Sequence, residues 1–441
     1  MENLRFDLTK REGKFKILNA TNGGPMYKRH ATEQFRSNYT TYKEVGFPYT
    51  RNHDSGVCAA FGGPFSHDVT HIFPCFDADP YAPESYDFAC TDEDILKAVE
   101  VGTKTFFRLG ETIEHQIKKH ATLPPKDFKK WAVICEHIIR HYNEGWANGF
   151  ELNIEYWEIW NEPNYAPEDS DNKCTWGGTN AQFFDFYEIA AKHLKKCFPN
   201  LKIGGPAYAG NEKLGEEKWA DEFLFEMRKR NVEIDFFSWH QYENMPEKII
   251  ALGESLKKLL IKHGYEKAES ICNEWNYVKG WTDEFVYSLE VIHGLKDASF
   301  IIAMMSLAQR SSVDMLMYYD TRPGVFNGIF DFYTLRPLKG YYPMKWYSDF
   351  YKMDSEVRPE KELEGIYSLC GIDKAGKILS VITHYTDDDN ATDKEISIDF
   401  GRKGKYEIYL LDSEHNGELV KITDELSFTM PVHSCIMIKE I

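Results

Sequence analysis

Residues 156–163 read Tyr-Trp-Glu-Ile-Trp-Asn-Glu-Pro, an aromatic run suited to a β-strand that stops at Asn161, Glu162 and Pro163. Pro163 has no backbone N–H to donate to a sheet, and it biases Glu162 towards extended geometry. The stretch therefore puts a carboxylate at the end of a predicted strand, which is where (β/α)8 barrels carry their active sites. Taken alone, the motif has a simpler alternative, a strand that happens to end in a solvated glutamate.

A second acid occupies the same setting further along the chain. Residues 272–276 read Cys-Asn-Glu-Trp-Asn, so another predicted strand ends in Glu274. Two carboxylates at the ends of two buried strands suit glycoside hydrolysis. In that reaction one acid protonates the leaving oxygen while the other attacks the anomeric carbon or activates water. The second acid strengthens the functional interpretation of Glu162.

Three segments together resemble glycoside hydrolase family 39: residues 157–163, 204–207 (Gly-Gly-Pro-Ala) and 273–276. The resemblance extends over residues 13–350. The family contains β-xylosidases and α-L-iduronidases and belongs to the retaining clan A, whose acid/base closes strand four and whose nucleophile closes strand seven. The resemblance thus implies that Glu162 is the acid/base and Glu274 the nucleophile. A retaining mechanism also implies carboxyl groups about 5 to 5.5 Å apart.

The resemblance implies further contacts around the two acids. Asn161 is expected to bind the sugar 2-hydroxyl, a contact that strengthens in the transition state. In residues 239–242, Trp-His-Gln-Tyr, the pair His240 and Tyr242 matches the clan's arrangement, in which the Tyr hydroxyl holds the nucleophile. The alternatives are a turn residue before proline for Asn161 and satisfied core groups for His240 and Tyr242.

Basic residues near the ends of strands two and three are expected to join this network. By resemblance, Arg51 lies beneath Glu274 and keeps it ionised, and His53 reaches sugar hydroxyls. Arg108, at the end of strand three, is a weaker candidate for the same network. A solvated turn is the alternative for the Arg51–His53 segment.

Aromatic residues after the later strands are candidates for apolar walls around a pyranose ring, with core packing as the alternative; they are Trp275, Trp281, Tyr319 and Phe326. The sequence departs from the resembled β-xylosidases after strand eight, where those enzymes show a Trp-Thr-Phe-like run and paired glutamates. Here Asp320 is the candidate replacement for a glutamate, and Arg322 is suited to the carboxylate of a uronic acid. The departure leaves xylose specificity open.

Strand and helix signals alternate from residue 15 to about residue 351, as a parallel α/β fold requires. The predicted strands are 15–20, 47–53, 103–109, 156–160, 201–205, 235–239, 269–273 and 315–319. The predicted helices include 32–44, 127–141, 283–310, 341–351 and stretches that start near residues 92, 180 and 249. A doubly wound open sheet is the alternative. Polar and aromatic clusters at the ends of strands two, four, six and seven favour a closed (β/α)8 TIM barrel.

The pattern changes beyond about residue 357. Residues 396–400 and 426–430 alternate with period two, separated by turns rich in Gly and Asp, which predicts an antiparallel β-sandwich. We therefore divide the chain into a catalytic barrel, 13–354, and an accessory β-sandwich, 355–441, with the N-terminal segment 1–12 expected to pair with the sandwich. A structural role for the sandwich is favoured over carbohydrate binding.

Composition narrows the class of partner. The net charge of −18 over 441 residues argues against nucleic acid or an anionic membrane. No apolar run resembles a signal peptide or a membrane span, and nine scattered cysteines do not suggest a disulfide framework. We therefore expect a cytoplasmic enzyme, although a chain trimmed of its signal would look the same. Self-association is expected by family analogy alone.

These observations predict a retaining glycoside hydrolase that removes a terminal glycosyl residue, with a β-xyloside as the first expected substrate. The alternatives are the same mechanism on another glycone, such as an α-L-iduronide, an arabinoside or another hexoside, and a carbohydrate-binding protein without turnover. A metal-dependent barrel hydrolase is a further alternative. The sequence has no Cys-x2-Cys or His-Glu-x2-His spacing, so we expect neither a metal nor an organic cofactor.

Overall fold

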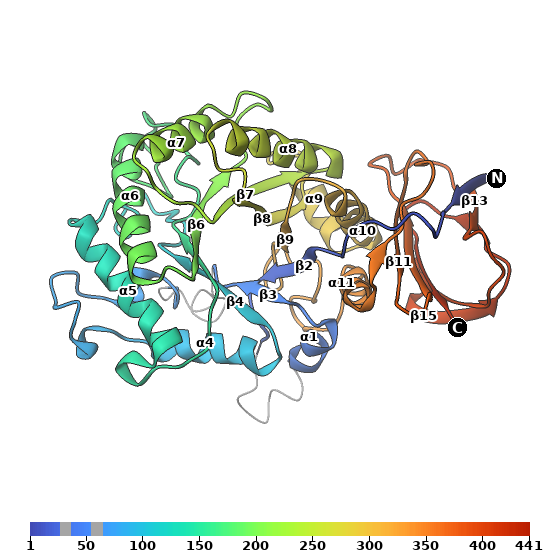
Figure 1. Cartoon of the computed structure of the whole chain (residues 1–441), viewed down its shortest axis with the longest axis horizontal. Helices are drawn as coiled ribbons and strands as arrows, with labels where there is room; N and C mark the ends of the chain where they lie inside the picture. Colours follow the sequence, from blue (N-terminus) through green and yellow to red (C-terminus); the bar gives the residue numbers. More distant parts are fainter. Residues whose placement is uncertain (27–36, 54–64) are drawn as a thin grey trace.

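Eight parallel strands close into a barrel in the computed structural model of the chain, which describes residues 1–26, 37–53 and 65–441. The strands follow one another around the barrel in chain order. They are β2 Ile17–Asn22, β3 Tyr49–Arg51, β4 Lys104–Leu109, β5 Tyr156–Ile159, β6 Lys202–Ala209, β7 Phe236–Glu243, β8 Glu269–Tyr277 and β9 Met315–Tyr318. The predicted TIM barrel is confirmed, and Figure 1 shows it beside a separate β domain that holds both chain ends.

Helices surround the barrel strands (Figure 1). The α-helices are α1 Tyr39–Val45, α3 Val69–Ile72, α4 Ala89–Glu100, α5 Phe128–Glu144, α6 Asn180–Cys197, α7 Lys218–Lys229, α8 Pro246–Lys262, α9 Phe285–Ile292, α10 Leu295–Gln309 and α11 Tyr341–Ser348. Short 3-10 turns are η2 Pro83–Ser85, η3 Trp146–Asn148 and η4 Asp349–Lys352. Within the described residues no single helix is long and apolar enough to cross a membrane, although the bent pair α9 and α10 together meets that standard by length and composition alone.

Two predicted helices differ from the structure, and two short or medium helices of the described chain, α3 and α7, were not predicted. The stretch 283–310 is two helices, α9 and α10, bent by 81° at a short break that contains Gly294. The helix predicted at 32–44 begins at Tyr39 in the described part of the chain, and residues 32–36 lie outside that part. Helix α7, between β6 and β7, has no counterpart among the predicted helices.

The C-terminal part forms two sheets. The larger has the order β10-β11-β12-β17-β14-β15 and is antiparallel, and the smaller has the order β1-β13-β16. Their strands are β1 Glu2–Arg5, β10 Ser355–Glu356, β11 Ile366–Ile372, β12 Ile378–His384, β13 Lys394–Asp399, β14 Tyr406–Leu411, β15 Asn416–Thr423, β16 Ser427–Met430 and β17 Cys435–Glu440. The N-terminal strand β1 pairs with β13 in parallel, so the smaller sheet is mixed.

The barrel interior is apolar at one end and polar at the other. The apolar cluster inside it consists of Ala20, Tyr49, Phe106, Tyr156, Phe236, Ile271, Met315 and Met317. Because successive residues of a strand point to opposite faces, the next inward positions lie closer to the carboxyl ends of the strands. Charged and amide side chains occupy those positions, among them Asn22, Arg51 and Glu158.

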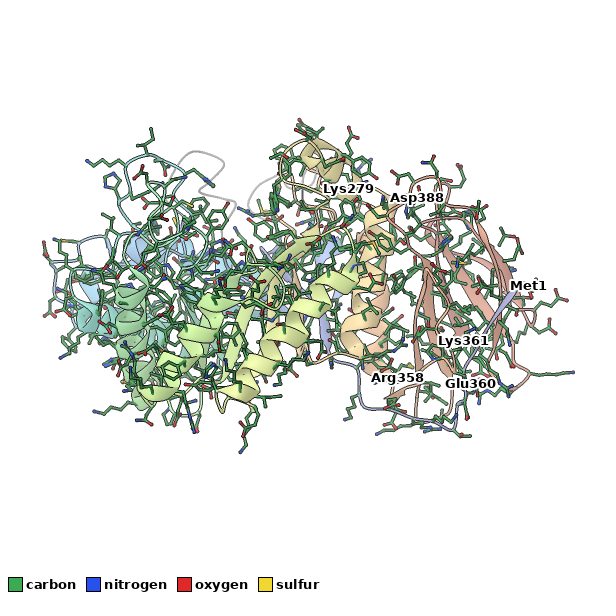
Figure 2. The ribbon with its side chains drawn as sticks, turned by 90° about the horizontal axis from the view of Figure 1, so that it is seen from above. Met1, Lys279, Arg358, Glu360, Lys361 and Asp388 are labelled. Carbon is green, nitrogen blue, oxygen red and sulfur yellow. The ribbon has the colours of Figure 1, made fainter. Side chains whose placement is uncertain are left out.

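The β domain packs against the barrel through α10 and through a loop that follows β12. Lys296 on α10 has a side chain only 6% exposed, and its Nζ lies 3.0 Å from Asp387 Oδ1 and 2.9 Å from Asp389 Oδ1. Lys279 lies 3.3 Å from Asp387 and sits beside Asp388 in Figure 2, where barrel and sandwich meet. This junction ties the loop to the end of the barrel that carries Glu274.

Candidate active site

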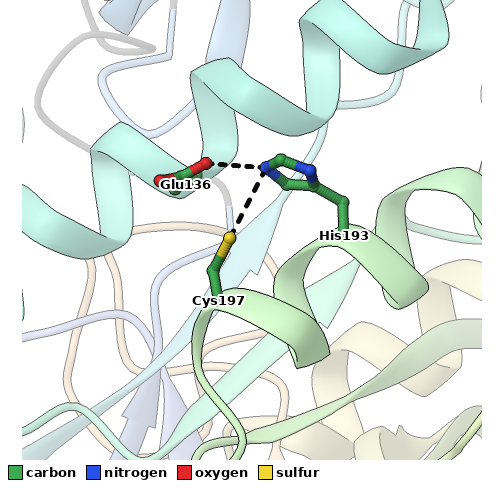
Figure 3. A group of neighbouring side chains, drawn as sticks. All are labelled: Glu136, His193 and Cys197. Atoms are coloured by element: carbon green, nitrogen blue, oxygen red, sulfur yellow. Dashed lines mark hydrogen bonds and ion pairs between the residues drawn. The ribbon is translucent and has the colours of Figure 1, made fainter.

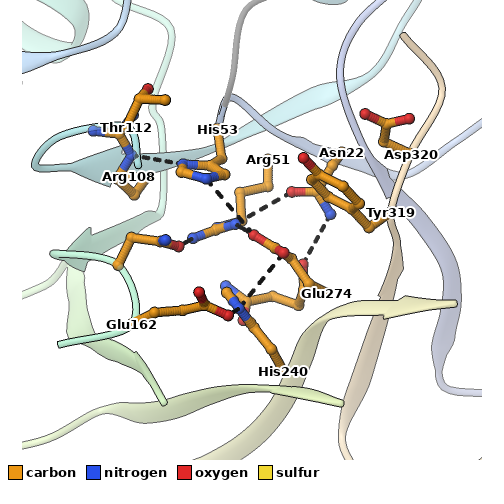
Figure 4. A network of polar contacts seen from close by, with 12 residues as sticks. Asn22, Arg51, His53, Arg108, Thr112, Glu162, His240, Glu274, Tyr319 and Asp320 are labelled. Atoms are coloured by element: carbon orange, nitrogen blue, oxygen red, sulfur yellow. Dashed lines mark hydrogen bonds and ion pairs between the residues drawn. The ribbon is translucent and has the colours of Figure 1, made fainter. Parts of the chain in front are cut away.

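Glu162 and Glu274 face each other at the carboxyl ends of the barrel strands, with His240 between them (Figure 4). An oxygen of each carboxylate and a ring nitrogen of His240 all lie within 4.8 Å of one another. His240 Nδ1 is 2.7 Å from Glu162 Oε1 and 3.5 Å from Glu274 Oε2. The two carboxylates are thus closer than the roughly 6.5–9.5 Å that an inverting pair requires, and the spacing fits the retaining geometry.

The backbone around Glu162 is not the extended one expected before Pro163. Both Trp160, with φ of 76°, and Glu162, with φ of 49°, adopt left-handed backbone conformations that non-glycine residues rarely occupy. Hydrogen bonds to the neighbouring strand and loop hold this shape, because the Glu162 N–H donates to Ala207 O at 2.9 Å and its carbonyl accepts from Thr175 Oγ1 at 2.7 Å. Strain of this kind is concentrated at functional sites.

Glu274 lies inside β8 rather than at its end, since the strand continues to Tyr277. The pairing of β7 with β8 shifts register between Trp239 and His240, so that Cys272 pairs with Trp239 and Glu274 with His240. Such a bulge redirects side chains locally. As a result Asn273 and Glu274, although adjacent, both reach the inner network.

Arg51 lies beneath Glu274 as expected, and it is completely buried. Its Nη1 is 2.6 Å from Glu274 Oε1, its Nε is 2.7 Å from Glu158 Oε2, and its Nη2 donates to Asn161 Oδ1 at 2.7 Å. Burial alone would lower the pKa of Arg51, but the charges of Glu158 and Glu274 together raise it. A permanent cation therefore lies under the predicted nucleophile.

Tyr242 also contacts Glu274 as expected, because its hydroxyl donates to Glu274 Oε2 at 2.8 Å. Burial and the Glu274 charge raise the pKa of Tyr242 well above its usual range, so the hydroxyl remains a donor. Burial also raises the pKa of Glu274 itself, whereas Arg51 and the Tyr242 hydrogen bond oppose the rise. Each oxygen of Glu274 thus has its own donor favouring the ionised form.

Several buried polar atoms near the acids have no hydrogen-bond partner among the described residues. They include Asn161 Nδ2, His240 Nε2 and Asn273 Oδ1. Because buried polar atoms are normally paired, such atoms in a site are available to a ligand. Burial lowers the pKa of His240 to about 4, so the ring is neutral at neutral pH. The Asn161 amide is placed as a donor, with its oxygen fixed by Arg51.

His53 and Arg108 join the same polar network on the side of β3 and β4. His53 Nε2 lies 3.9 Å from Glu274 Oε1, and Arg108 Nε donates to His53 Nδ1 at 3.2 Å. Arg108 Nη2 in turn is 2.7 Å from Asp68 Oδ1. Burial raises the pKa of Asp68, and the Arg108 charge opposes this rise. His53 is thereby oriented towards the nucleophile by a buried ion pair.

The predicted aromatic walls divide into two groups. Trp281, 58% exposed, lies 5.4 Å between ring centroids from Tyr242 and 6.1 Å from Phe326, and Tyr319 packs against Tyr242 and Phe326 at 6.2 and 5.9 Å. These rings border Glu274 through Tyr242. Trp275 is completely buried with Phe300 and Tyr318 among the barrel helices. Trp275 as a substrate contact is therefore wrong, because it points to the opposite face of β8 from Glu274.

Asp320 and Arg322 pair with each other after β9. Arg322 Nε donates to Asp320 Oδ2, and Arg322 Nη2 donates to the Tyr319 hydroxyl. Asp320 is almost completely buried, whereas Arg322 is half-buried. The acid already neutralises the guanidinium that was considered for a uronic acid, which weakens that alternative.

Sequence reasoning missed two of the buried polar residues inside the barrel, Glu158 and Asn22. Asn273 Nδ2 donates to Glu158 Oε1 at 2.5 Å, and Arg51 Nη1 is 3.4 Å from Asn22 Oδ1. Glu158 could have been found from the sequence, because it is a charged residue within an aromatic strand and a buried acid requires a partner. Asn22 carries no comparable signal in the sequence.

The fold also brings together potential metal ligands that the sequence spacing does not reveal. In the described part of the chain two groups have ligand atoms within 4.8 Å of one another. One is Glu162, His240 and Glu274, where the Arg51 cation 2.6 Å from Glu274 opposes a second cation. The other, Glu136, His193 and Cys197, lies on α5 and α6, outside the site.

A parallel barrel with two close, buried carboxylates at its carboxyl ends has the architecture of the retaining glycosidase barrels. A sequence model described as "Glycosyl hydrolases family 39" matches residues 15–319, and the chain belongs to this family. It is 29% identical over 211 residues to a β-xylosidase from Geobacillus stearothermophilus, a match covering 45% of this chain and 37% of that protein.

Solved structures share the whole fold. A glucosidase from Croceicoccus marinus superimposes with a TM-score of 0.81 at 21% identity, covering 100% of this chain and 99% of that one. A monomeric β-xylosidase from Caulobacter crescentus CB15 gives a TM-score of 0.70 at 16% identity, again over 100% and 99%. At these identities the likeness establishes the architecture of barrel and sandwich together.

Proposed function

We propose that the protein is a retaining glycoside hydrolase that removes a terminal glycosyl residue through a covalent glycosyl-enzyme. The observation that carries the proposal is the pair Glu162 and Glu274, whose oxygens lie within 4.8 Å, with Arg51 and Tyr242 each bonded to a different oxygen of Glu274. This asymmetry supports different roles for two similar acids.

In the first step a Glu274 oxygen attacks the anomeric carbon as the bond to the leaving oxygen breaks. Arg51 and Tyr242 hold Glu274 as a carboxylate, which the attack requires. The step requires Glu162 to carry a proton, and this acid is almost completely buried beside the charge of Glu274. Glu162 gives this proton to the leaving oxygen, so the aglycone departs as a neutral alcohol.

In the second step water attacks the anomeric carbon, and the bond to Glu274 breaks. Glu162, now ionised, accepts the proton of the attacking water, which regenerates both acids. The Nδ2 of Asn161 donates to the sugar 2-hydroxyl in both transition states, because the amide oxygen is held by Arg51. His240 keeps Glu162 in place through the 2.7 Å contact of its Nδ1.

We propose a β-xyloside as the first substrate, since the curated relative is a β-xylosidase. The same machinery also suits another glycone, and the glucosidase among the structural neighbours supports a hexoside. The pairing of Asp320 with Arg322 lowers the case for an α-L-iduronide, since the guanidinium already has a carboxylate partner.

The test is the intact mass of the protein after incubation with 2-deoxy-2-fluoro glycosyl donors, which slow both steps and trap the intermediate. Xylosyl, arabinosyl, glucosyl, galactosyl and iduronyl donors are compared. The expected result is one added glycosyl residue with one donor, and no addition to E274A. Labelling of E274A would remove Glu274 from the nucleophile's role. Sugar binding without labelling by any donor would favour the non-hydrolytic alternative.

A second variant separates the acid/base from the nucleophile. In E162A, a substrate with a good leaving group needs no proton for the first step, so the intermediate should form and then accumulate. Added azide should restore turnover by attacking the intermediate without a base, and the product should be a glycosyl azide of retained configuration. Absence of this product would assign Glu162 another role.

A further inference from the structure

The second group of potential metal ligands lies on the outer layer of the barrel, between α5 and α6 (Figure 3). Glu136 comes from α5, and His193 and Cys197 come from α6. The last two are four residues apart, so they share one helix face. All three side chains turn towards one another across the interface of the two helices.

Both contacts in this group converge on one atom of His193. Glu136 Oε2 is 2.7 Å from His193 Nε2, and Cys197 Sγ is 3.8 Å from the same nitrogen. A nucleophile, base and acid that relay a proton use the two ring nitrogens separately. This arrangement therefore does not fit a thiol-based catalytic triad. It does place three potential ligand atoms close enough to bind one ion.

The donor set is one thiol, one imidazole and one carboxylate, which suits a borderline-soft divalent ion such as Zn²⁺. Zinc bond lengths at tetrahedral angles put sulfur and nitrogen about 3.5 Å apart and oxygen and nitrogen about 3.3 Å apart. For an ion to bind, Cys197 Sγ must move slightly closer to His193 Nε2, from which it is now 3.8 Å away. Glu136 Oε2, now 2.7 Å from the same nitrogen, must move away by about half an ångström.

The surroundings leave the group accessible and hold its carboxylate in place. The His193 side chain is 30% exposed, so solvent reaches the cluster and supplies a fourth ligand. Arg140 Nε donates to Glu136 Oε1 at 2.9 Å, which leaves Oε2 directed at His193. The Arg140 side chain is 31% exposed, so solvent screens its repulsion of a bound cation, whereas the Arg51 side chain at the other group is completely buried.

We propose that Glu136, His193 and Cys197 form a binding site for Zn²⁺ or a similar divalent ion, with water as the fourth ligand. The site is separate from the catalytic acids and is independent of the proposed hydrolase activity. On binding, the Cys197 thiol loses its proton to solvent as the metal–sulfur bond forms. The bound ion joins α5 to α6 and stabilises the folded state.

The test is a titration of metal-free protein with Co²⁺, whose thiolate complexes absorb in the near ultraviolet. The expected result is one equivalent bound with a thiolate band in the wild type, and displacement of the band by Zn²⁺. C197S should lose the band, and H193A and E136Q should each bind at least tenfold more weakly. C90S, which replaces an exposed cysteine, is the matched control and should behave as the wild type.

Thermal unfolding supplies a second readout. Zn²⁺ should raise the midpoint temperature of unfolding of the wild type and of C90S, but not that of C197S or E136Q. E136Q preserves the side-chain volume of Glu136, so it still tests the proposal if C197S folds poorly. Absence of Co²⁺ binding would overturn the proposal. Co²⁺ binding that shows no thiolate band, persists in C197S and is lost in E162Q would also overturn it, because the ion would then lie between Glu162 and Glu274.

Discussion

Arg51 is the residue on which the predicted nucleophile depends, because it is fully buried and bonded to Glu158, Asn161 and Glu274 at once. A buried guanidinium between two carboxylates carries a large desolvation cost, which the two ion pairs offset. Lysine has no planar fork and cannot reach all three partners from one position. A single cation thus fixes both the proposed nucleophile, Glu274, and the amide of Asn161 that we propose binds the sugar.

Removing the second donor to Glu274 should slow catalysis without disturbing the fold. In Y242F the carboxylate loses a 2.8 Å hydrogen bond. A hydrogen bond to a charged group contributes about 1.5–3 kcal/mol, so kcat should fall about 10- to 100-fold. The acidic limb of the kcat/KM profile should also move to higher pH, because the ionised form of Glu274 is less favoured. Y333F, at an exposed tyrosine, is the control, and an unmoved limb in Y242F would contradict this account.

His67, a buried histidine away from Glu162 and Glu274, should make the stability of the fold decrease at acidic pH. Burial lowers the pKa of His67 to about 4, so between pH 4 and 6.5 the unfolded chain binds more protons and stability falls as pH falls. In H67Q the loss of unfolding free energy between pH 7 and 4.5 should be smaller than in the wild type by about 2–3 kcal/mol. Urea unfolding across this range measures it. Parallel curves would contradict the prediction, and H115Q, at an exposed histidine, should match the wild type.

At the scale of elements, the sequence predicted all eight barrel strands because each is a short apolar run bounded by turn residues. It did not predict where β7 and β8 end, since both continue past the expected boundary to Glu243 and Tyr277. Pairing between the two strands extends them, and that is a tertiary effect. The left-handed backbone at Glu162 also depends on partners elsewhere, including Ala207.

Among the site residues, Glu162, Glu274, Arg51 and Tyr242 meet as the motifs indicated, whereas Trp275 does not. Trp275 directly follows an inward-facing acid, so the alternation of a strand already directed it outward. The bulge opposite His240 was not predictable, because it depends on the register of two strands.

The end of β5 should be sensitive to a methyl group on the neighbouring strand. A Cβ on Gly110, just after β4, would lie 3.0 Å from Trp160 Cα, immediately before Asn161 and Glu162. We expect G110A to lower stability by about 1–3 kcal/mol and to lower kcat, because displacement of Trp160 moves both site residues. G102A is the matched control, since Gly102 also has a positive φ but nothing within 4 Å. Urea unfolding and kcat are measured for both, and equal effects would assign the loss to backbone strain alone.

At the scale of the whole molecule, the sandwich loop contacts the same two strands that carry the site. Asp387 accepts from Tyr277 Oη at 2.6 Å, at the end of β8, and from Asn244 Nδ2 at 2.7 Å, just after β7. Burial would raise the pKa of Asp387, but hydrogen bonds from Tyr277, Asn244 and Lys296 lower it, so it is ionised at neutral pH. The β domain thus supports the ends of the strands that present Tyr242 and Glu274.

Neutralising this loop should affect both stability and catalysis. D387N leaves the buried Lys296 with Asp389 as its remaining acidic partner in the structure, and we expect a loss of about 1–3 kcal/mol because the junction is only partly solvated. The kcat should fall severalfold with little change in KM, since the ends of β7 and β8 lose their support while Asn161 is untouched. D393N, at an exposed acid of the same domain, should change neither value. If stability falls and kcat does not, the sandwich holds the molecule together without positioning its acids.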